Sequence, residues 1–274
     1  MDISKLIAQV QEKGPDQTQV KKGSELPKEG TARLRLVEYV ELGKQKHKYK
    51  GADKESVRVH CAFELSGKDY PPIETDDGPR PRIISQTFTL SMSDKAQFFK
   101  LFTRMRAGTT AKHIIELVGD RAAFLGNIVH NKDGDNTYAN IDFDTVKPAY
   151  LEQLAEDGET IIKTPLNVSS ALTKPLLFVW QFATPEMWDS LYIPGEWDAK
   201  TDANGVVVRP AASKNKWQEI IRKALNFNTL PCYDYAAGAV SKESAEALTE
   251  AVGDVVTSKP AAQPDPDNLM EGIG

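Results

Sequence analysis

The sequence of 274 residues has few of the residue types that build metal sites, disulfide frameworks or membrane spans. Its two cysteines, Cys61 and Cys232, form no Cys-x-x-Cys pair, and its four histidines show no His-Glu-x-x-His spacing. We therefore expect neither a structural zinc site nor a disulfide scaffold. No apolar run approaches the roughly 20 residues that cross a bilayer. Residues 1–14 also lack the features of a secretory signal, so we expect an intracellular protein without membrane contact.

Motifs of the common catalytic sites are also missing. The sequence has no GxxxxGK[ST] phosphate loop, no GxSxG nucleophile motif and no GxGxxG after a predicted strand. Asp142 and Asp144 share one face of a predicted strand, and Asp133 and Asp135 flank Gly134. These acids suggest a metal site, but Asp and Gly are also typical turn formers, which is the interpretation we favour for the second pair. We expect no enzyme, no cofactor and no metal.

Acidic charge is concentrated at the C-terminal end of the chain. The net charge is −5, and residues 241–274 contain seven acids against Lys242 and Lys259. The remaining residues are therefore formally neutral. A neutral body can still hold a polyanion through local basic segments, because binding responds to the local potential.

Five strands are predicted for residues 30–148 from the alternation of apolar and polar residues. Their ranges are 30–42, 56–65, 83–91, 120–130 and 137–148. The first strand changes its apolar phase near Val37, which predicts a bulge or a strong bend. The last two strands are joined by an Asp-Gly turn and form a predicted hairpin.

A helix is predicted between the third and fourth strands. Residues 93–108 change to a period of i, i+3, i+4 and i+7, carried by Phe98, Leu101, Phe102 and Met105. Ser93 and Asp94 are candidate N-caps, and Gly108 ends the helix. A second short helix is predicted over residues 110–119, and the proline-rich segment 66–82 is predicted to be a loop.

This order of elements predicts a mainly β protein with helices, built on a five-stranded OB-fold Greek-key barrel. We divide the chain into an N-terminal extension and linker (1–29), the OB-fold domain (30–148), an extension packed on or beside the barrel (149–235) and a flexible acidic tail (236–274).

The stretch "KQKHKYKGADK", residues 44–54, falls in the first loop of this predicted barrel, and "HNKDGDN", residues 130–136, falls in the last. In an OB-fold these loops flank the ligand face of the second and third strands. Cations beside flat rings suit single-stranded nucleic acid, because bases stack on the rings and phosphates contact the cations. The candidate nucleic-acid-binding residues are Lys44, Lys46, His47, Lys48, Tyr49, Lys50, Lys54, Arg58, His60, Tyr70, His130, Lys132 and Tyr138.

Alternatives remain open for these residues. The lysine run is also typical of a solvated loop, and each tyrosine is equally explained by covering the barrel wall. Arg33, Arg35 and Arg58 lie out of the apolar phase, where they either extend a cationic face or increase solubility. Phe63 and Phe88 are predicted to pack in the core, as is Phe143.

Three segments carry a resemblance to a known family. They are "SQTFTLSMSDKAQFFKLFTRMRAG", "LVGDRAAFLGNIVHNKDGDNTYANIDFDTVKP" and "FVWQFATPEMWDSLYIPGEW". With residues 30–148 as a whole, they resemble the single-stranded DNA-binding proteins of bacteriophages, a divergent OB-fold group. The resemblance implies coating of single-stranded DNA without strong sequence preference during viral DNA replication or recombination, in the cytoplasm of the infected bacterial host.

The resemblance also implies replication proteins as partners of the acidic C-terminal tail, and it is compatible with an oligomer. Tails of this family usually finish with an aromatic residue, which "SKPAAQPDPDNLMEGIG" lacks. Leu269, Met270 and Ile273 offer an apolar contact in its place, and a merely solubilising tail is the alternative.

Residues 149–235 are rich in aromatic residues. We expect a helix or turn after residue 149, a short helix from Pro185 to about Leu191 capped by Thr184, and a loop or hairpin over 198–210. An amphipathic helix is predicted over 213–227, with its apolar face formed by Trp217, Ile220, Ile221, Ala224 and Leu225. Packing against the barrel, a subunit interface and an extension of the DNA path all remain open for this segment.

Two other functions are consistent with the sequence. An OB-fold protein-interaction module would bind or modulate a replication or host enzyme, and a structural virion component would form large stable assemblies. The cationic stretch is explained best by DNA binding.

Overall fold

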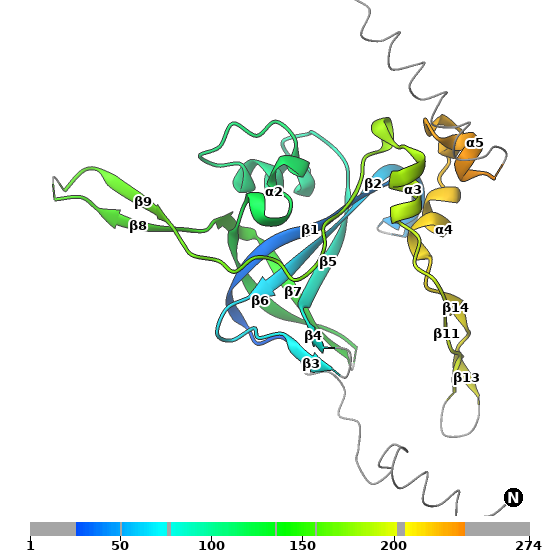
Figure 1. Ribbon diagram of the computed structural model, residues 1–274, viewed down its shortest axis with the longest axis horizontal. Coiled ribbons are helices and arrows are strands. Elements are labelled where there is room, and N and C mark those ends of the chain that lie inside the picture. The colour runs from blue at the N-terminus through cyan, green and yellow to red at the C-terminus, as the bar shows by residue number, and fades with distance from the viewer. Residues whose placement is uncertain are drawn as a thin grey trace, which may run out of the picture.

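The computed structural model describes residues 26–49, 51–75, 78–134, 136–156, 158–201 and 206–238. The fold is mainly β with a few short helices, as the sequence predicts. Figure 1 shows a central twisted sheet with helices at two places around it and two thin hairpin arms that project away from the body. Within the described residues, no helix is long and apolar enough to cross a membrane.

The central sheet has the strand order β5–β2–β1–β6–β7, and all of these neighbours are antiparallel. The strands are β1 (Gly30–Tyr49), β2 (Ala52–Ser66), β5 (Arg82–Thr89), β6 (Phe124–Asp133) and β7 (Asn136–Pro148). The register between β1 and β2 shifts between Leu36 and Glu38, which confirms the predicted bulge near Val37. The predicted loop 66–82 contains a small hairpin of β3 (Ile73–Thr75) and β4 (Gly78–Arg80).

The sheet curls around a core of its inward-facing apolar side chains, but it does not close. Phe88 of β5 and Phe143 of β7 touch across the core with ring centroids 5.1 Å apart. Among the described residues, however, no backbone pairing joins β5 to β7, and a cleft of about 490 Å³ lies between these strands. The expected closed barrel is therefore not confirmed.

The helix α2 (Gln97–Met105) buries the four apolar side chains that the sequence periodicity assigns to it. Its N-cap is Ala96, which makes no side-chain cap, so the predicted caps Ser93 and Asp94 are wrong; both lie in the turn before the helix. The predicted second helix consists of two 3-10 turns, η1 (Ile114–Leu117) and η2 (Gly119–Arg121). Gly119, with φ of 68°, takes up the left-handed conformation at the junction between them.

Residues 176–238 form a second apolar cluster against the far half of β1. β10 (Leu176–Phe178) pairs in parallel with β1 at Glu38 to Val40, on the same edge of β1 that holds β6 further back. The remaining elements are η3 (Trp180–Phe182), α3 (Pro185–Ser190), α4 (Lys216–Arg222), η4 (Phe227–Thr229) and α5 (Tyr233–Ala236). Thr184 caps α3 as predicted. The helix predicted over 213–227 is shorter in the structure, because α4 ends at Arg222; Leu225 lies beyond it and its side chain is 45% exposed.

Two hairpin arms leave the body (Figure 1). The first is β8 (Tyr150–Leu154) with β9 (Ile161–Pro165), so the expected helix or turn after residue 149 is wrong. β8 and β9 pair antiparallel over five residue pairs, from Tyr150 with Pro165 to Leu154 with Ile161. The second arm pairs β11 (Glu196–Trp197) with β14 (Ala212–Ser213), and β12 (Lys200–Thr201) with β13 (Val207–Arg209). Of the loop or hairpin predicted over 198–210, the structure has the hairpin, extended at both ends.

Candidate nucleic-acid interface

The lysine stretch is a two-stranded ribbon and not the loop that we expected. The β1–β2 ladder continues without interruption from Lys44 paired with Val57 to Tyr49 paired with Ala52. We call residues 44–57 the lysine ribbon. Because side chains alternate along a strand, Lys44, Lys46 and Lys48 share one face of it. Lys50 lies outside the described residues.

Acids opposite the lysines neutralise part of their charge. Lys46 is paired with Glu55 and Lys48 with Asp53, and such directly opposed residues share a face of the sheet. Lys44 Nζ lies 2.8 Å from Glu55 Oε2. The hydrogen bond from Lys44, followed by its charge, lowers the pKa of the Glu55 carboxyl. The exposed ammonium groups of Lys46 and Lys48 are therefore better placed to bind a phosphate than that of Lys44.

The other face of the ribbon carries His47 opposite Lys54. Lys54 is exposed, whereas the His47 ring is half-buried and its Nδ1 has no hydrogen-bond partner among the described residues. At the base of the ribbon, the Arg58 guanidinium donates to Thr89 Oγ1 at 3.1 Å and to the Thr87 carbonyl at 3.2 Å. Partial burial lowers the Arg58 pKa. Arg58 is thus occupied in holding β2 to β5.

His60 and Tyr70 are buried, so the expectation that they stack on bases is wrong for this structure. The His60 ring packs against Trp217 with centroids 4.3 Å apart, and its Nε2 lies 3.5 Å from Glu38 Oε2. The Tyr70 ring belongs to the main core, and its hydroxyl donates to the carbonyls of Lys28 and Gly30. Both rings stabilise the fold and offer no free face.

The remaining predicted residues lie near the opposite end of β1 from the lysine ribbon. β6 runs antiparallel to β1, and its Ile128 pairs with Gly30 at the start of that strand. Gly30 and Lys46 are sixteen residues apart along β1, which corresponds to about 50 Å of chain measured along the curved strand, at about 3.3 Å per residue. The residues of the β6–β7 hairpin therefore form a second group, separate from the ribbon.

Within this second group, His130 is already engaged by the segment before β1. Its Nε2 lies 2.7 Å from the Pro27 carbonyl, and its backbone N–H donates to Glu29 Oε1. Lys132 is exposed, and Tyr138 is 50% exposed on the wall of the cleft between β5 and β7. Lys132 and Tyr138 therefore remain accessible, whereas His130 is not free to contact a ligand through Nε2.

The outer face of the sheet is covered by the chain's own residues 167–174, which we call the strap. Arg35 is buried and donates through Nη2 to the Val168 carbonyl and through Nε to the Ser169 carbonyl, each at 2.7 Å. The Glu64 carboxylate, also buried, accepts from the backbone N–H groups of Leu172 and Thr173, each at 2.8 Å. The strap therefore covers part of the sheet surface that the sequence analysis predicted to bind the ligand. Arg35 anchors the strap and adds nothing to a cationic face.

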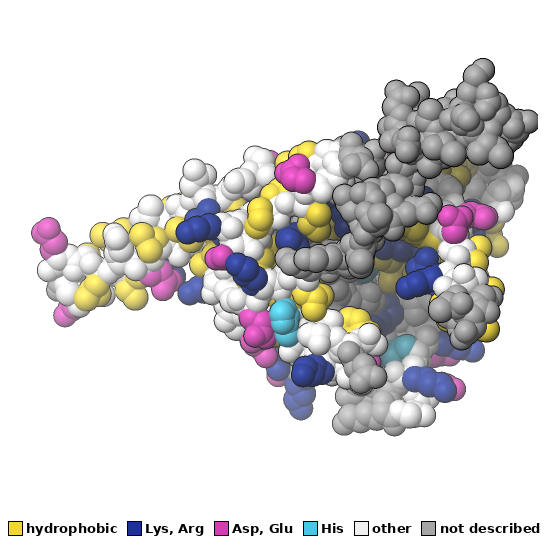
Figure 2. Space-filling model, turned by 90° about the horizontal axis from the view of Figure 1, so that it is seen from below, with side chains coloured by type: hydrophobic (Ala, Val, Ile, Leu, Met, Phe, Trp, Pro, Cys, Tyr) yellow, Lys and Arg dark blue, Asp and Glu magenta, His cyan; other side chains and the backbone are white. Residues whose placement is uncertain are grey.

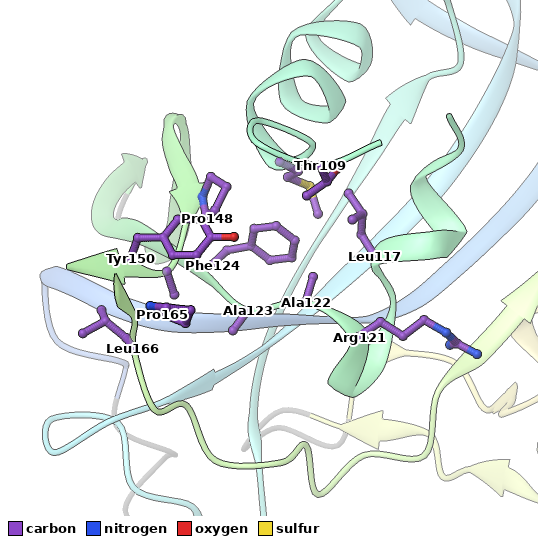
Figure 3. Close-up of a pocket in the computed structure, with 12 residues that line it drawn as sticks. Thr109, Leu117, Arg121, Ala122, Ala123, Phe124, Pro148, Tyr150, Pro165 and Leu166 are labelled. Carbon is purple, nitrogen blue, oxygen red and sulfur yellow. The ribbon is translucent and has the colours of Figure 1, made fainter. Parts of the chain in front are cut away.

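Two further cavities in the described residues have mainly apolar linings. A cavity of about 210 Å³ lies at the base of the first arm, and Arg121 is the charged residue of its lining. Figure 3 shows its residues Phe124, Pro148 and Tyr150 opposite Leu117. A second cavity, of about 350 Å³, lies at the base of the ribbon; Val57, Met92 and Phe182 contribute apolar surface to its lining, and Glu41 and His113 contribute titratable groups. No group of three or more His, Cys, Asp or Glu that suits a metal occurs in the described part of the chain.

Trp197 and Lys214 of the second arm are surface residues that the sequence analysis did not single out. Trp197 is 54% exposed, and Lys214 Nζ lies 4.7 Å from the centre of its ring. A tryptophan within the polar, turn-forming stretch "PGEWDAKTDANG" could have indicated this position. Figure 2 shows lysines and arginines in small groups on the lower face of the molecule, between acids, and not as one continuous patch.

Comparisons of the chain with protein-family models, with curated proteins and with solved structures found no match. Its function is therefore inferred from the chemistry of its own residues.

Proposed function

We propose that this protein binds single-stranded DNA without strong sequence preference and that the lysine ribbon is its main contact. The observation that carries the proposal is the exposure of Lys46, Lys48 and Lys54 on one continuous two-stranded ribbon. Flexible ammonium groups bind phosphates without reading bases, which gives affinity that is strong at low salt and insensitive to sequence.

The sheet supports this proposal because its topology agrees with an open form of the OB-fold. The five principal strands pair in the order third, second, first, fourth, fifth, and α2 lies between the third and fourth in the chain. OB-folds are partly open Greek-key barrels that bind oligonucleotides beside the connection of their first two strands. The lysine ribbon is that connection.

The strap changes where the DNA would lie. Residues 167–174 cover the outer face of β1 and β2. The single-stranded DNA would therefore follow the lysine ribbon and its flanks and would not contact the middle of the sheet. The resemblance of the sequence to bacteriophage DNA-binding proteins supports a role in viral DNA replication or recombination inside the host bacterium. No catalytic step is part of this proposal.

The proposal is tested by fluorescence anisotropy of a labelled oligodeoxythymidine and of a labelled mixed-sequence strand, each at several salt concentrations. We expect both strands to bind with similar affinity and both affinities to fall as salt rises. Absence of binding at low salt would overturn the proposal. Equal affinity for the matching duplex would overturn the preference for single strands.

A protein-interaction module is the second candidate, and the first arm favours it. The arm exposes the apolar side chains of Leu151, Leu154, Ile161 and Ile162, which monomeric proteins rarely place together on an isolated hairpin. This function requires that replacing Leu154 and Ile161 by serine abolishes a specific protein contact while DNA binding persists.

A further inference from the structure

The second hairpin arm combines an exposed aromatic ring with three basic residues, Lys200, Arg209 and Lys214, although its sequence also contains the acids Glu196 and Asp198. Its four short strands contain two or three residues each, and nearly all of their side chains are exposed. A two-stranded ribbon of this kind has no core of its own and is at best marginally stable in water. Its side chains are therefore accessible to a ligand.

Trp197 differs from the other tryptophans of the chain. It is 54% exposed, whereas Trp180, Trp188 and Trp217 are each at most 9% exposed within the second apolar cluster. Lys214 Nζ covers one side of the Trp197 ring at 4.7 Å from its centre. A solvent-exposed indole beside an ammonium group is the pairing on which an unpaired base stacks while its phosphate contacts the cation.

A second observation on the same arm points to an anionic ligand. Lys200 of β12 is directly opposite Arg209 of β13, so two positive side chains share one face of the ribbon. Like charges in this position destabilise a hairpin. Within the described residues no acid forms an ion pair with either of them. A bound phosphate would remove the repulsion.

The first arm does not offer the same chemistry. Its sequence around the turn, "LEQLAEDGET", contains four acids and no base, and Lys163 of β9 is paired with Glu152 at 3.3 Å. A polyanion would be repelled there. The two arms therefore differ in the class of ligand that they suit.

The second arm and the lysine ribbon are attached to the same helix. β14 leads directly into α4, and Gln45 Nε2 of the ribbon donates to the carbonyl of Ile220 in α4 at 3.0 Å. Just after α4, Asn226 Oδ1 accepts from the Lys44 backbone N–H at 2.6 Å. The base of the second arm and the lysine ribbon are therefore both anchored at α4.

We infer that the second arm is an additional contact for single-stranded DNA, in which Trp197 stacks on a base and Lys200, Arg209 and Lys214 contact the adjacent phosphates. This inference rests on the proposed function, because it extends the path of the strand bound by the ribbon. It does not require sequence recognition, since each base presents a face that stacks on an indole.

The test uses the intrinsic tryptophan fluorescence of the full chain during titration with unlabelled oligodeoxythymidine. Because the other three indoles are buried, we expect the quenching to come from Trp197 and to disappear in Trp197→Phe. Affinity, measured separately by anisotropy, should fall only slightly in Trp197→Phe and by roughly 5- to 150-fold in Trp197→Ala. A phenyl ring still stacks, so this pair of variants separates stacking from a general loss of structure.

The charge contribution is tested with Lys200→Glu/Arg209→Glu against the control Lys95→Glu/Lys100→Glu. The control residues are exposed lysines in and before α2. We expect the arm variant to bind more weakly and the control to bind as the wild type does. Quenching that persists in Trp197→Phe, or unchanged affinity in Trp197→Ala, would overturn the inference while leaving the ribbon proposal intact. Absence of any DNA binding by the wild type would overturn both.

Discussion

The two exposed lysines of the ribbon should determine a defined part of the salt dependence of DNA binding. Lys46 and Lys48 are exposed, whereas Lys44 is held by Glu55 at 2.8 Å. Each phosphate that a lysine neutralises on a single strand contributes about 0.7 to the slope of log affinity against log salt. The double variant Lys46→Gln/Lys48→Gln should therefore have a slope smaller by about 1.4.

This difference is large enough to measure. Between about 50 and 200 mM salt, a slope difference of about 1.4 corresponds to about a sevenfold difference in the loss of affinity. The assay is fluorescence anisotropy of a labelled oligodeoxythymidine at four or more salt concentrations. The matched control is Lys95→Gln/Lys100→Gln, which removes the same charge from the region of α2.

Lys44→Gln provides an internal comparison. Because its ammonium group is already paired with Glu55, its removal should change the slope by clearly less than either exposed lysine does. An unchanged slope in Lys46→Gln/Lys48→Gln would refute the assignment of the ribbon as the phosphate contact. An equal effect of Lys44→Gln would refute the distinction between the paired Lys44 and the exposed Lys46 and Lys48.

Three further predictions concern the fold. Gly43→Ala should lower the free energy of unfolding by about 2 to 5 kcal/mol, because φ is 72° and the new Cβ would collide with the Trp180 ring; an unchanged thermal midpoint would contradict this. Tyr70→Phe should cost about 1 kcal/mol of stability through its lost hydroxyl bonds and leave oligonucleotide affinity unchanged, so a loss of affinity without a loss of stability would restore Tyr70 as a binding residue. The Glu116 pKa is lowered by hydrogen bonds from the backbone N–H groups of His113 and Lys112. The stabilisation by the Glu116 carboxylate is therefore present at neutral pH and is lost as the pH falls through that lowered pKa. The thermal midpoints of the wild type and of Glu116→Gln should therefore converge in acid. A difference between the midpoints that is constant with pH would contradict a stabilising role of the ionised carboxylate.

The sequence predicts the local elements of the sheet well, because one face of most strands is buried. The alternation over Val57 to Leu65 places Val59, Cys61 and Phe63 in the core as expected. The helical period of α2 is confirmed in the same way. The predicted start of α2 was wrong because Ser93 and Asp94 lie in the preceding turn, where the Ser93 hydroxyl donates a hydrogen bond to the Asp94 carboxylate.

The wrong predictions for the candidate site have a common cause. Residues that looked exposed in the sequence are buried by segments that lie far away along the chain. Nothing local to His60 reveals that Trp217, more than 150 residues later, packs on its ring. Arg35 and Glu64 look like surface charges in an alternating strand until the strap supplies backbone partners for them. Such contacts depend on where residues 149–238 pack on the sheet. The helical period of residues 213–227 predicts a buried face for Trp217 but does not say which strand that face covers.

The parallel pairing of β10 with β1 has a consequence for how the protein would behave when its chain is cut. β10 and Phe178 bind the half of β1 that contains Val40, and the helices that follow bury the same surface. A protease acting on the exposed turn of the first arm would sever the chain between these regions without separating them. The nicked protein should elute as one species in gel filtration and divide into two fragments only in denaturant, which would allow the halves to be produced separately and recombined.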